Sequence, residues 1–138
     1  MRLADFEGAW TIERRITDAR TGRPGRLDGV ARFTPDAAGL AYVEEGLLAL
    51  GDGPALTASR RYLWRDGGPS AIEVHFSDGR LFHRFRTDDP TPTAEHDCPP
   101  DRYHARYDFR AWPCWTAEWR AVGPRKDYIL LTRYRPAA

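Results

Sequence analysis

Short segments of alternating apolar and polar residues, separated by turn signals, most restrict how this 138-residue chain can fold. Glycine, proline and aspartate cluster at short intervals, as in TGRPG at 21–25, DGGPS at 66–70 and DDPTP at 88–92. These residues favour turns for distinct backbone reasons. The segments between the clusters are about 6 to 10 residues long, which is typical of strands rather than helices. The pattern therefore predicts an all-β chain.

Within these segments, the side chains alternate with a period of two. Trp10, Ile12 and Ile16 share one face of the first segment, and Trp115 and Trp119 share one face of a segment near the C-terminus. Such alternation indicates that one side of each strand is buried. Ten strands are predicted, over residues 9–17, 26–34, 40–49, 55–65, 71–77, 80–87, 93–97, 102–110, 114–122 and 128–135.

The short connections between these segments predict an up-and-down antiparallel meander. A meander of this many strands removes its exposed edges when it closes into a single β-barrel. A sandwich of two sheets is the structural alternative, although sandwiches usually contain longer crossover connections than this chain offers. The sequence has no internal repeat, low-complexity tract or linker, so we expect residues 1–138 to form one domain.

The amino-acid composition of the chain limits the classes of binding partner that we expect. Hydrophobic residues make up 41% of the chain and charged residues 30%, which is close to globular usage and argues against disorder. The formal net charge of +1 gives no electrostatic reason to expect a nucleic acid. Arginine supplies nearly all the positive charge, since Lys126 is the only lysine. Its planar guanidinium suits carboxylates, phosphates and aromatic faces.

Two further observations concern location and redox state. No apolar run approaches the roughly 20 residues that cross a bilayer, and MRLADFEGAW contains no apolar stretch of signal-peptide length. We therefore expect a cytoplasmic protein without a membrane partner, as a monomer or homodimer. Cys98 and Cys114 are then expected to be free thiols rather than a disulfide.

The opening stretch DFEGAW carries a family resemblance. Phe6, Gly8 and Trp10 resemble the F-x-G-x-W start of the calycin superfamily, which includes lipocalins, fatty-acid-binding proteins and nitrobindin-like haem barrels. The resemblance implies a barrel with Trp10 at its closed end. It also implies that an arginine of the last strand packs across the indole ring in a cation–π contact. Arg133 and Arg135, in YILLTRYRP, are the candidates.

The whole chain also resembles a family of uncharacterised bacterial proteins with a calycin-like barrel, through RYLWR, YDFRAWPCWTAEWR and GPRKDY. That family brings no established activity. Ten strands are similar to the fatty-acid-binding and nitrobindin branch rather than to the eight-strand lipocalins. Fatty-acid-binding proteins, however, have a helical lid where this chain has only DARTGRPG. Their carboxylate-binding arginine and tyrosine lie two residues apart, whereas Arg133 and Tyr134 are adjacent.

Charged residues occur on faces that should point into the barrel. Arg14 lies an even number of residues after Trp10, so it faces the barrel interior if Trp10 does. The same alternation places Glu44 and Arg60 at inward-facing positions. A buried charge is costly unless it is paired or hydrogen-bonded. One interpretation is an internal Arg–Glu pair with ordered waters, or a face assignment wrong by one residue. The other is a pocket in which Arg14 and Arg60 hold an anionic ligand between aromatic walls. The candidate ligand-binding residues are Arg14, Tyr42, Glu44, Arg60, Tyr62, Trp64, His83, Tyr103 and Tyr107.

The stretch AEHDCPPDRYHARYDF places His96 and Cys98 two residues apart. Zinc sites normally draw four ligands from paired motifs, so a metal here would need His75, His83 or Cys114 as well, and we predict none. A Cys98 nucleophile activated by His96 is chemically feasible, but no oxyanion-stabilising element accompanies it. The simplest interpretation is a loop at the barrel mouth with a partly exposed thiol.

Haem is the alternative to our prediction of no cofactor, because the nitrobindin-like branch binds haem through histidine. Among the four histidines, His83 is the best placed to face a cavity, between Leu81 and Phe85. A histidine on an apolar face is, however, more often a satisfied core residue. Trp115 and Trp119 are interpreted either as barrel core or as an aromatic wall for a flat ligand.

Three classes of function follow, and we rank binding first. The first is a small-molecule-binding barrel for an apolar or aromatic ligand with an acidic group. The second is a barrel enzyme, since some calycin-like barrels are lyases or decarboxylases, in which Glu44 and a tyrosine form an acid–base pair. The third is an interaction module without a pocket that uses surface arginines. The arginines considered are Arg15, Arg32, Arg84 and Arg86.

Overall fold

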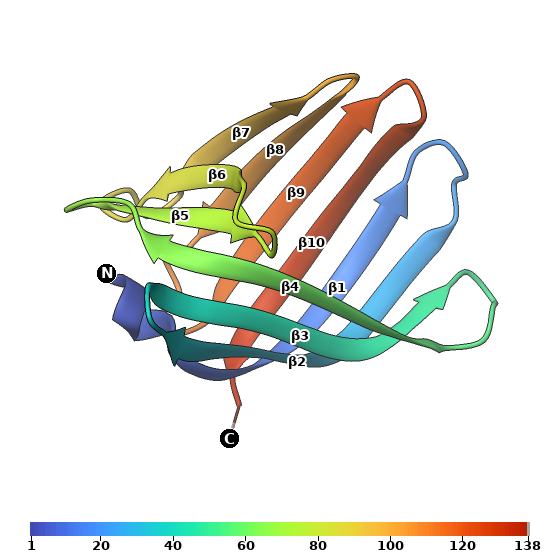
Figure 1. The fold of residues 1–138 in the computed structure, drawn as a ribbon. Coiled ribbons are helices and arrows are strands. Elements are labelled where there is room, and N and C mark those ends of the chain that lie inside the picture. The colour runs from blue at the N-terminus through green and yellow to red at the C-terminus, as the bar shows by residue number, and fades with distance from the viewer. Residues whose placement is uncertain (138) are drawn as a thin grey trace.

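The computed structural model describes residues 1–137 as ten antiparallel strands with a short 3-10 helix at one end (Figure 1). The elements are η1 (Leu3–Phe6), β1 (Gly8–Asp18), β2 (Pro24–Asp36), β3 (Gly39–Leu50), β4 (Leu56–Asp66), β5 (Ala71–Phe76), β6 (Leu81–Arg86), β7 (Thr93–Cys98), β8 (Asp101–Asp108), β9 (Trp115–Gly123) and β10 (Lys126–Pro136). The all-β prediction is confirmed, and every strand boundary lies within two residues of its predicted position. Among the described residues, no helix has the length and apolarity needed to span a membrane.

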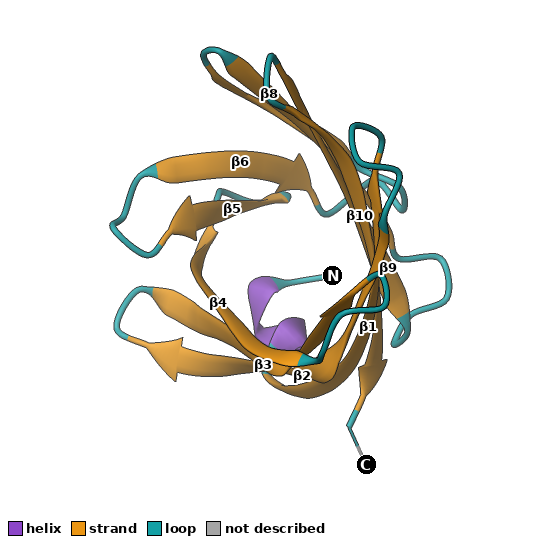
Figure 2. Ribbon diagram, turned by 90° about the vertical axis from the view of Figure 1, so that its right-hand side faces the viewer, coloured by secondary structure: helices purple, strands orange, loops and turns teal. Residues whose placement is uncertain are grey.

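The strands form a nearly closed barrel. Each strand from β1 to β5 pairs with the next one in the chain, and so does each strand from β7 to β9. The pairing of β1 with β10 joins these two runs. The resulting order is β6-β5-β4-β3-β2-β1-β10-β9-β8-β7, so β6 and β7 are the two edges of one sheet. Figure 2 shows that the ring is open between β6 and the β7–β8 hairpin, which is labelled there by β8. The alternative of a two-sheet sandwich is therefore wrong.

The two ends of the barrel differ. The β1–β2, β3–β4, β5–β6, β7–β8 and β9–β10 hairpins gather at one end, which we call the mouth (Figure 1). The helix η1 lies within the ring at the other end, which we call the closed end (Figure 2).

Trp10 lies buried at the closed end, where aromatic side chains fill the barrel. Its indole Nε1 donates a 2.9 Å hydrogen bond to the carbonyl oxygen of Phe6, and its ring centroid lies 5.6 Å from that of Trp112 and 5.9 Å from that of Trp115. Gly8, at φ 123°, adopts a backbone conformation that favours glycine and lets the chain turn between η1 and β1. The opening stretch thus folds Phe6 and Trp10 against each other as a plug.

The arginine expected to cover Trp10 is not there, so that prediction is wrong. Leu130, Thr132 and Tyr134 are the buried residues of the last strand, and their alternation turns Arg133 and Arg135 to the outer face. Both arginines are exposed, and Arg135 pairs with Glu13 at 3.1 Å. Tryptophan rings from the β8–β9 connection and β9 occupy the space beside Trp10 instead.

Candidate functional site at the barrel mouth

A buried ion pair crosses the middle of the barrel. Arg14 on β1 and Glu44 on β3 are only 4% and 2% exposed, and their side chains form two hydrogen bonds of 2.6 and 2.8 Å. The Nε of Arg14 donates a further 2.7 Å hydrogen bond to Thr132 Oγ1 on β10. A bidentate arginine–carboxylate pair is among the strongest polar contacts in proteins. The two charges therefore neutralise each other inside the barrel.

Two tyrosines complete this polar network. The hydroxyl of Tyr42 donates to Glu44 Oε1 at 2.6 Å and lies 2.8 Å from the hydroxyl of Tyr134. Burial raises the pKa of Tyr42 well above its ordinary value and the pKa of Tyr134 to about 12, so both hydroxyls stay protonated. Burial by itself raises the pKa of Glu44, but hydrogen bonds from Arg14 and Tyr42 outweigh it and lower that pKa. The carboxylate is thus held ionised.

The network corresponds to the first interpretation of the inward charges, an internal Arg–Glu pair. Arg14, Tyr42 and Glu44 all point inward, as their parity predicted. Both oxygens of Glu44 accept hydrogen bonds from Arg14, and one also accepts from Tyr42. Glu44 is therefore not the free base that the enzyme hypothesis requires.

A cavity of about 140 Å³ lies inside the barrel on the mouth side of the network. Inward positions of β4, β5, β6, β8, β9 and β10 form its walls. The lining residues are Arg60, Tyr62, Phe76, Phe82, Tyr103, Trp119, Ala121, Tyr128 and Leu130. Three of the predicted candidates, Arg60, Tyr62 and Tyr103, therefore meet in one place.

Arg60 gives this cavity a positive charge. It is the register partner of Glu44 across β3 and β4, yet Glu44 is already bonded to Arg14. No carboxylate within residues 1–137 forms an ion pair with the half-buried Arg60. Burial raises the pKa of Tyr62, and the nearby Arg60 guanidinium reduces that rise. The mouth cavity thus holds a guanidinium that forms no ion pair with a carboxylate of residues 1–137.

Aromatic rings form most of the cavity wall. The rings of Tyr62 and Phe82 are nearly parallel, with centroids 6.0 Å apart and planes at 25°. Trp119 stands edge-on to both, at 5.5 and 5.2 Å. Its indole Nε1 is buried and has no hydrogen-bond partner within the described chain. Trp119 therefore belongs to the cavity wall, whereas Trp115, stacked on Tyr134 at 3.7 Å, belongs to the closed-end core.

The remaining candidates lie away from the cavity. Trp64 packs in the closed-end core, with its ring centroid 4.8 Å from that of Phe33 and 5.2 Å from that of Phe6. His83 and Tyr107 form a separate buried pair, with His83 Nε2 2.7 Å from the Tyr107 hydroxyl. Burial lowers the pKa of His83 to about 3, so its ring is neutral. The nine candidates thus divide among the network, the cavity, the core and this pair.

The residues present do not fit a haem. His83 is the histidine that would bind the iron, but its Nε2 is hydrogen-bonded to Tyr107 and it does not line the cavity. The cavity volume of about 140 Å³ is also below the roughly 300–1,000 Å³ of drug-sized ligand and cofactor sites.

His96 and Cys98 lie on the last residues of β7, beside the mouth. The ring of His96 packs against Phe82 and Phe76, at 5.5 and 5.9 Å, across the seam between β6 and β7. Cys98 is exposed at the hairpin, and both it and Cys114 are free thiols. Within residues 1–137, no three histidine, cysteine or acidic side chains gather in a way that could hold a metal ion.

The surface arginines considered for an interaction module lie on distant parts of the sheet. Arg15 and Arg32 are exposed on β1 and β2, and Arg84 and Arg86 are exposed on the edge strand β6. Arg86 binds Asp88, and Arg84 donates to the carbonyl oxygen of Gly67 at 2.9 Å. These four residues therefore do not form one basic stripe.

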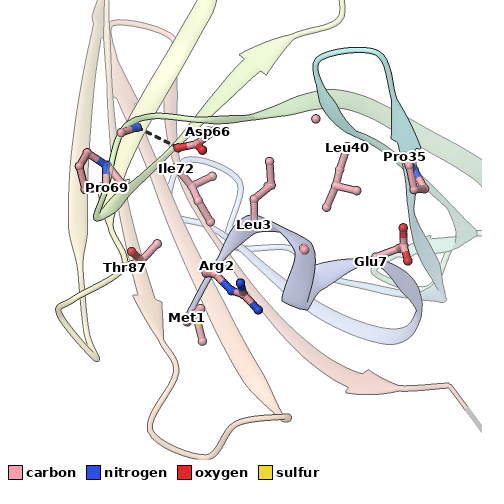
Figure 3. A pocket seen from close by; sticks show the side chains of 14 residues that line it. Met1, Arg2, Leu3, Glu7, Pro35, Leu40, Asp66, Pro69, Ile72 and Thr87 are labelled. Carbon is pink, nitrogen blue, oxygen red and sulfur yellow. Dashed lines mark hydrogen bonds between the residues drawn. The ribbon is translucent and has the colours of Figure 1, made fainter.

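A second and larger pocket, of about 700 Å³, lies at the closed end, beside η1. Figure 3 shows Leu3 of η1 between Leu40 and Ile72, with Arg2 and Glu7 nearby. None of the nine predicted candidates lines this pocket. The mouth cavity instead combines an aromatic wall with a guanidinium that has no carboxylate partner in residues 1–137, so we take it as the candidate site.

Several residues of the network and the cavity are absent from the sequence-based candidates. Thr132 and Tyr134 join the network, and Tyr128 and Leu130 line the cavity. These four residues share one parity on β10, which the sequence pattern leaves ambiguous because Ile129 and Leu131 are apolar on the other face. The two arginines at positions 133 and 135 were the signal in the sequence that the odd-numbered residues of β10 face outward. Phe76, Phe82 and Ala121 are the other cavity residues that were missed, whereas Trp119 is one of the two tryptophans interpreted above as core or as an aromatic wall.

Among solved structures, one shares this fold and two others match more weakly. The chain superimposes on the S-type phycobiliprotein lyase CPES from Guillardia theta with a TM-score of 0.69 and 9% sequence identity, covering 100% of this chain and 94% of that one. A redesigned β-barrel, mFAP1, bound to DFHBI, matches with a TM-score of 0.46 and 10% identity, over 97% and 98% of the two chains. A de novo designed fluorescence-activating β-barrel matches with a TM-score of 0.40 and 15% identity, over 98% and 96%.

Sequence comparison places the chain in a family. No curated protein matches it. A family model, however, matches residues 6–136, which is nearly the whole barrel. The chain therefore belongs to the family of unknown function DUF6314.

Proposed function

We propose that this protein is a calycin-like barrel domain that binds a small organic anion in its mouth cavity. Arg60 is the observation that carries the proposal, because it is a half-buried guanidinium on an aromatic wall without a carboxylate partner in residues 1–137. A convergent polar group within apolar walls is the usual composition of a ligand site. The acidic group of the ligand would supply the missing negative charge.

The calycin assignment rests on two further observations. The F-x-G-x-W start forms the plug at the closed end, through Phe6 and Trp10. The barrel also has a fold similar to that of the phycobiliprotein lyase. Tyr62 and Tyr103 then serve as cavity residues, while Arg14, Tyr42 and Glu44 neutralise the interior beneath them.

Calorimetric titration with carboxylates of different shape tests this proposal. Benzoate, 2-naphthoate and decanoate are titrated into the wild-type protein, Arg60→Gln and Arg61→Gln. Arg61 is the matched control, because it is the next residue on the same strand and is exposed on the outer face. A hydrogen-bonded charge contributes about 1.5–3 kcal/mol, so we expect Arg60→Gln to weaken binding by about tenfold or more.

Two outcomes would contradict the proposal. One is that none of the three carboxylates binds the wild-type protein. The other is that Arg60→Gln binds them as tightly as Arg61→Gln does. The melting temperature of each variant, measured without ligand, shows whether a loss of binding reflects a loss of folding.

A further inference from the structure

We infer that the ligand of the mouth cavity is a monocyclic aromatic acid of the benzoate class, with one six-membered ring and one acidic group. This inference rests on the proposed function and adds the size and shape of the ligand. Three observations carry it: the cavity volume, the arrangement of the rings around it, and the position of its charges.

The volume of the cavity corresponds to one small ring. It measures about 140 Å³, and an engineered apolar cavity of about 150 Å³ in another protein binds benzene. A fused bicyclic acid or a long acyl chain would have to displace the wall or extend out of the mouth. The cavity is therefore the right size for a single ring.

The wall presents flat faces and ring edges to the cavity. Phe76 stacks on Phe82 with centroids 4.6 Å apart, and Phe82 is nearly parallel to Tyr62. Trp119 and Tyr103 stand perpendicular to Phe82, at 5.2 and 5.7 Å. Aromatic rings prefer these stacked and edge-to-face arrangements. A planar ligand can extend this pattern, whereas a puckered ring of the same size cannot stack.

The charges select an acid rather than a neutral ring. Lys126, at the same end of the barrel, pairs with Asp101 at 3.2 Å and donates to the Tyr103 hydroxyl at 3.2 Å. Its charge is therefore compensated within the protein. Arg60 is the cation left for the ligand, and Tyr128, which lines the same cavity, adds a phenol side chain to its wall.

The test compares four probes of matched size or charge by calorimetry at pH 7. Benzoate is the reference, benzamide removes the charge, cyclohexanecarboxylate removes the planarity, and 2-naphthoate adds a ring. We expect benzoate to bind the wild-type protein at least tenfold more tightly than each of the other three. We also expect Arg60→Gln, but not Arg61→Gln, to remove this preference for benzoate over benzamide.

A variant that enlarges the cavity supplies a control that does not depend on stability. Phe76 is half-buried, and Phe76→Ala removes one ring of the wall. The ratio of 2-naphthoate to benzoate affinity should then rise at least tenfold over the wild-type ratio. An unchanged ratio would overturn the size argument, since the wall would not be limiting the ligand.

The possible failures are distinguishable. If 2-naphthoate or decanoate binds the wild-type protein best and Arg60→Gln weakens that binding, the monocyclic class is wrong and the proposed function stands. If the carboxylates bind wild type and Arg60→Gln equally, or none binds, both proposals fail. If cyclohexanecarboxylate binds as tightly as benzoate, the requirement for an aromatic ring is wrong.

Discussion

Arg14 and Glu44 are 30 residues apart in the chain and meet in the middle of the barrel. Replacing such a buried pair by apolar residues is often neutral, but removing one partner leaves the other charge without compensation. Thr132 and Tyr42 satisfy further hydrogen-bonding atoms of the same two side chains. The network is therefore expected to respond very differently to single and double substitutions.

Glu44→Gln should destabilise the protein by about 3–5 kcal/mol, because it leaves the Arg14 guanidinium buried without a counter-charge. Arg14→Met should cost a similar amount for the converse reason. The double variant should lose clearly less than the sum of the two. Urea unfolding of the four proteins measures these free energies, and additive losses would show that the two side chains do not depend on each other.

The pair should also make stability fall in acid. The folded pKa of Glu44 lies below its ordinary value of 4.5. The stability that its charge confers is therefore complete above that value and is lost as the pH falls through the folded pKa. His83 contributes in a different pH range, since burial lowers its pKa from 6.5 to about 3.

His83 should make the protein less stable between pH 6.5 and about 3. The unfolded chain binds a proton at this residue below pH 6.5, while the folded protein keeps the ring neutral. Stability should fall by up to about 1.4 kcal/mol for each pH unit below 6.5. In His83→Gln, which keeps a group able to hydrogen-bond with Tyr107, this part of the slope should be absent. Urea unfolding at pH 7, 6 and 5 provides the comparison, and equal slopes in both proteins would count against a buried neutral His83.

At the scale of the elements, β2 and β3 approach each other unusually closely at one point. Gly29 and Gly46 are register partners there. A Cβ atom on Gly46 would lie 2.5 Å from the carbonyl oxygen of Asp28, and one on Gly29 would meet the carbonyl oxygen of Glu45. Neither glycine has a positive φ, so space rather than backbone conformation requires them.

Gly46→Ala should therefore destabilise the protein by about 1–3 kcal/mol, the usual cost of forcing extra atoms into a packed region. Gly53→Ala is the matched control, because Gly53 lies in the β3–β4 hairpin with one neighbouring atom, at 3.1 Å. Its effect should stay within about 0.5 kcal/mol. Thermal and urea unfolding measure both, and similar losses would show that the close approach is not restrictive.

The elements also differ in how far the sequence predicted them. The strands were predictable because a period of two marks the buried face of most of them and turn residues bound them. The open seam between β6 and β7 was not predictable, because its position depends on how far the sheet curls before its two edges meet. A bulge between Val74 and His75 adds a local irregularity at this edge, where Phe82 and His83 are both buried.

At the scale of the whole molecule, the barrel contains three layers along its axis. Aromatic rings around Phe6 and Trp10 fill the closed end, the Arg14–Glu44 network crosses the middle, and the mouth keeps a cavity. This order places the neutralised charges below Arg60, which has no carboxylate partner in residues 1–137. A ligand that enters the cavity therefore meets the guanidinium of Arg60, and the calorimetric test of Arg60→Gln examines this arrangement.

The sequence by itself determined the strands, the meander and the side of the sheet on which Trp10, Arg14, Glu44 and Arg60 lie. Alternation and turn chemistry are local, so they can be read from neighbouring residues. Only the tertiary structure decided that Arg14 pairs with Glu44 while Arg60 does not, and that Arg133 faces outward. Those outcomes depend on register and on contacts across the barrel, between residues that no local pattern connects.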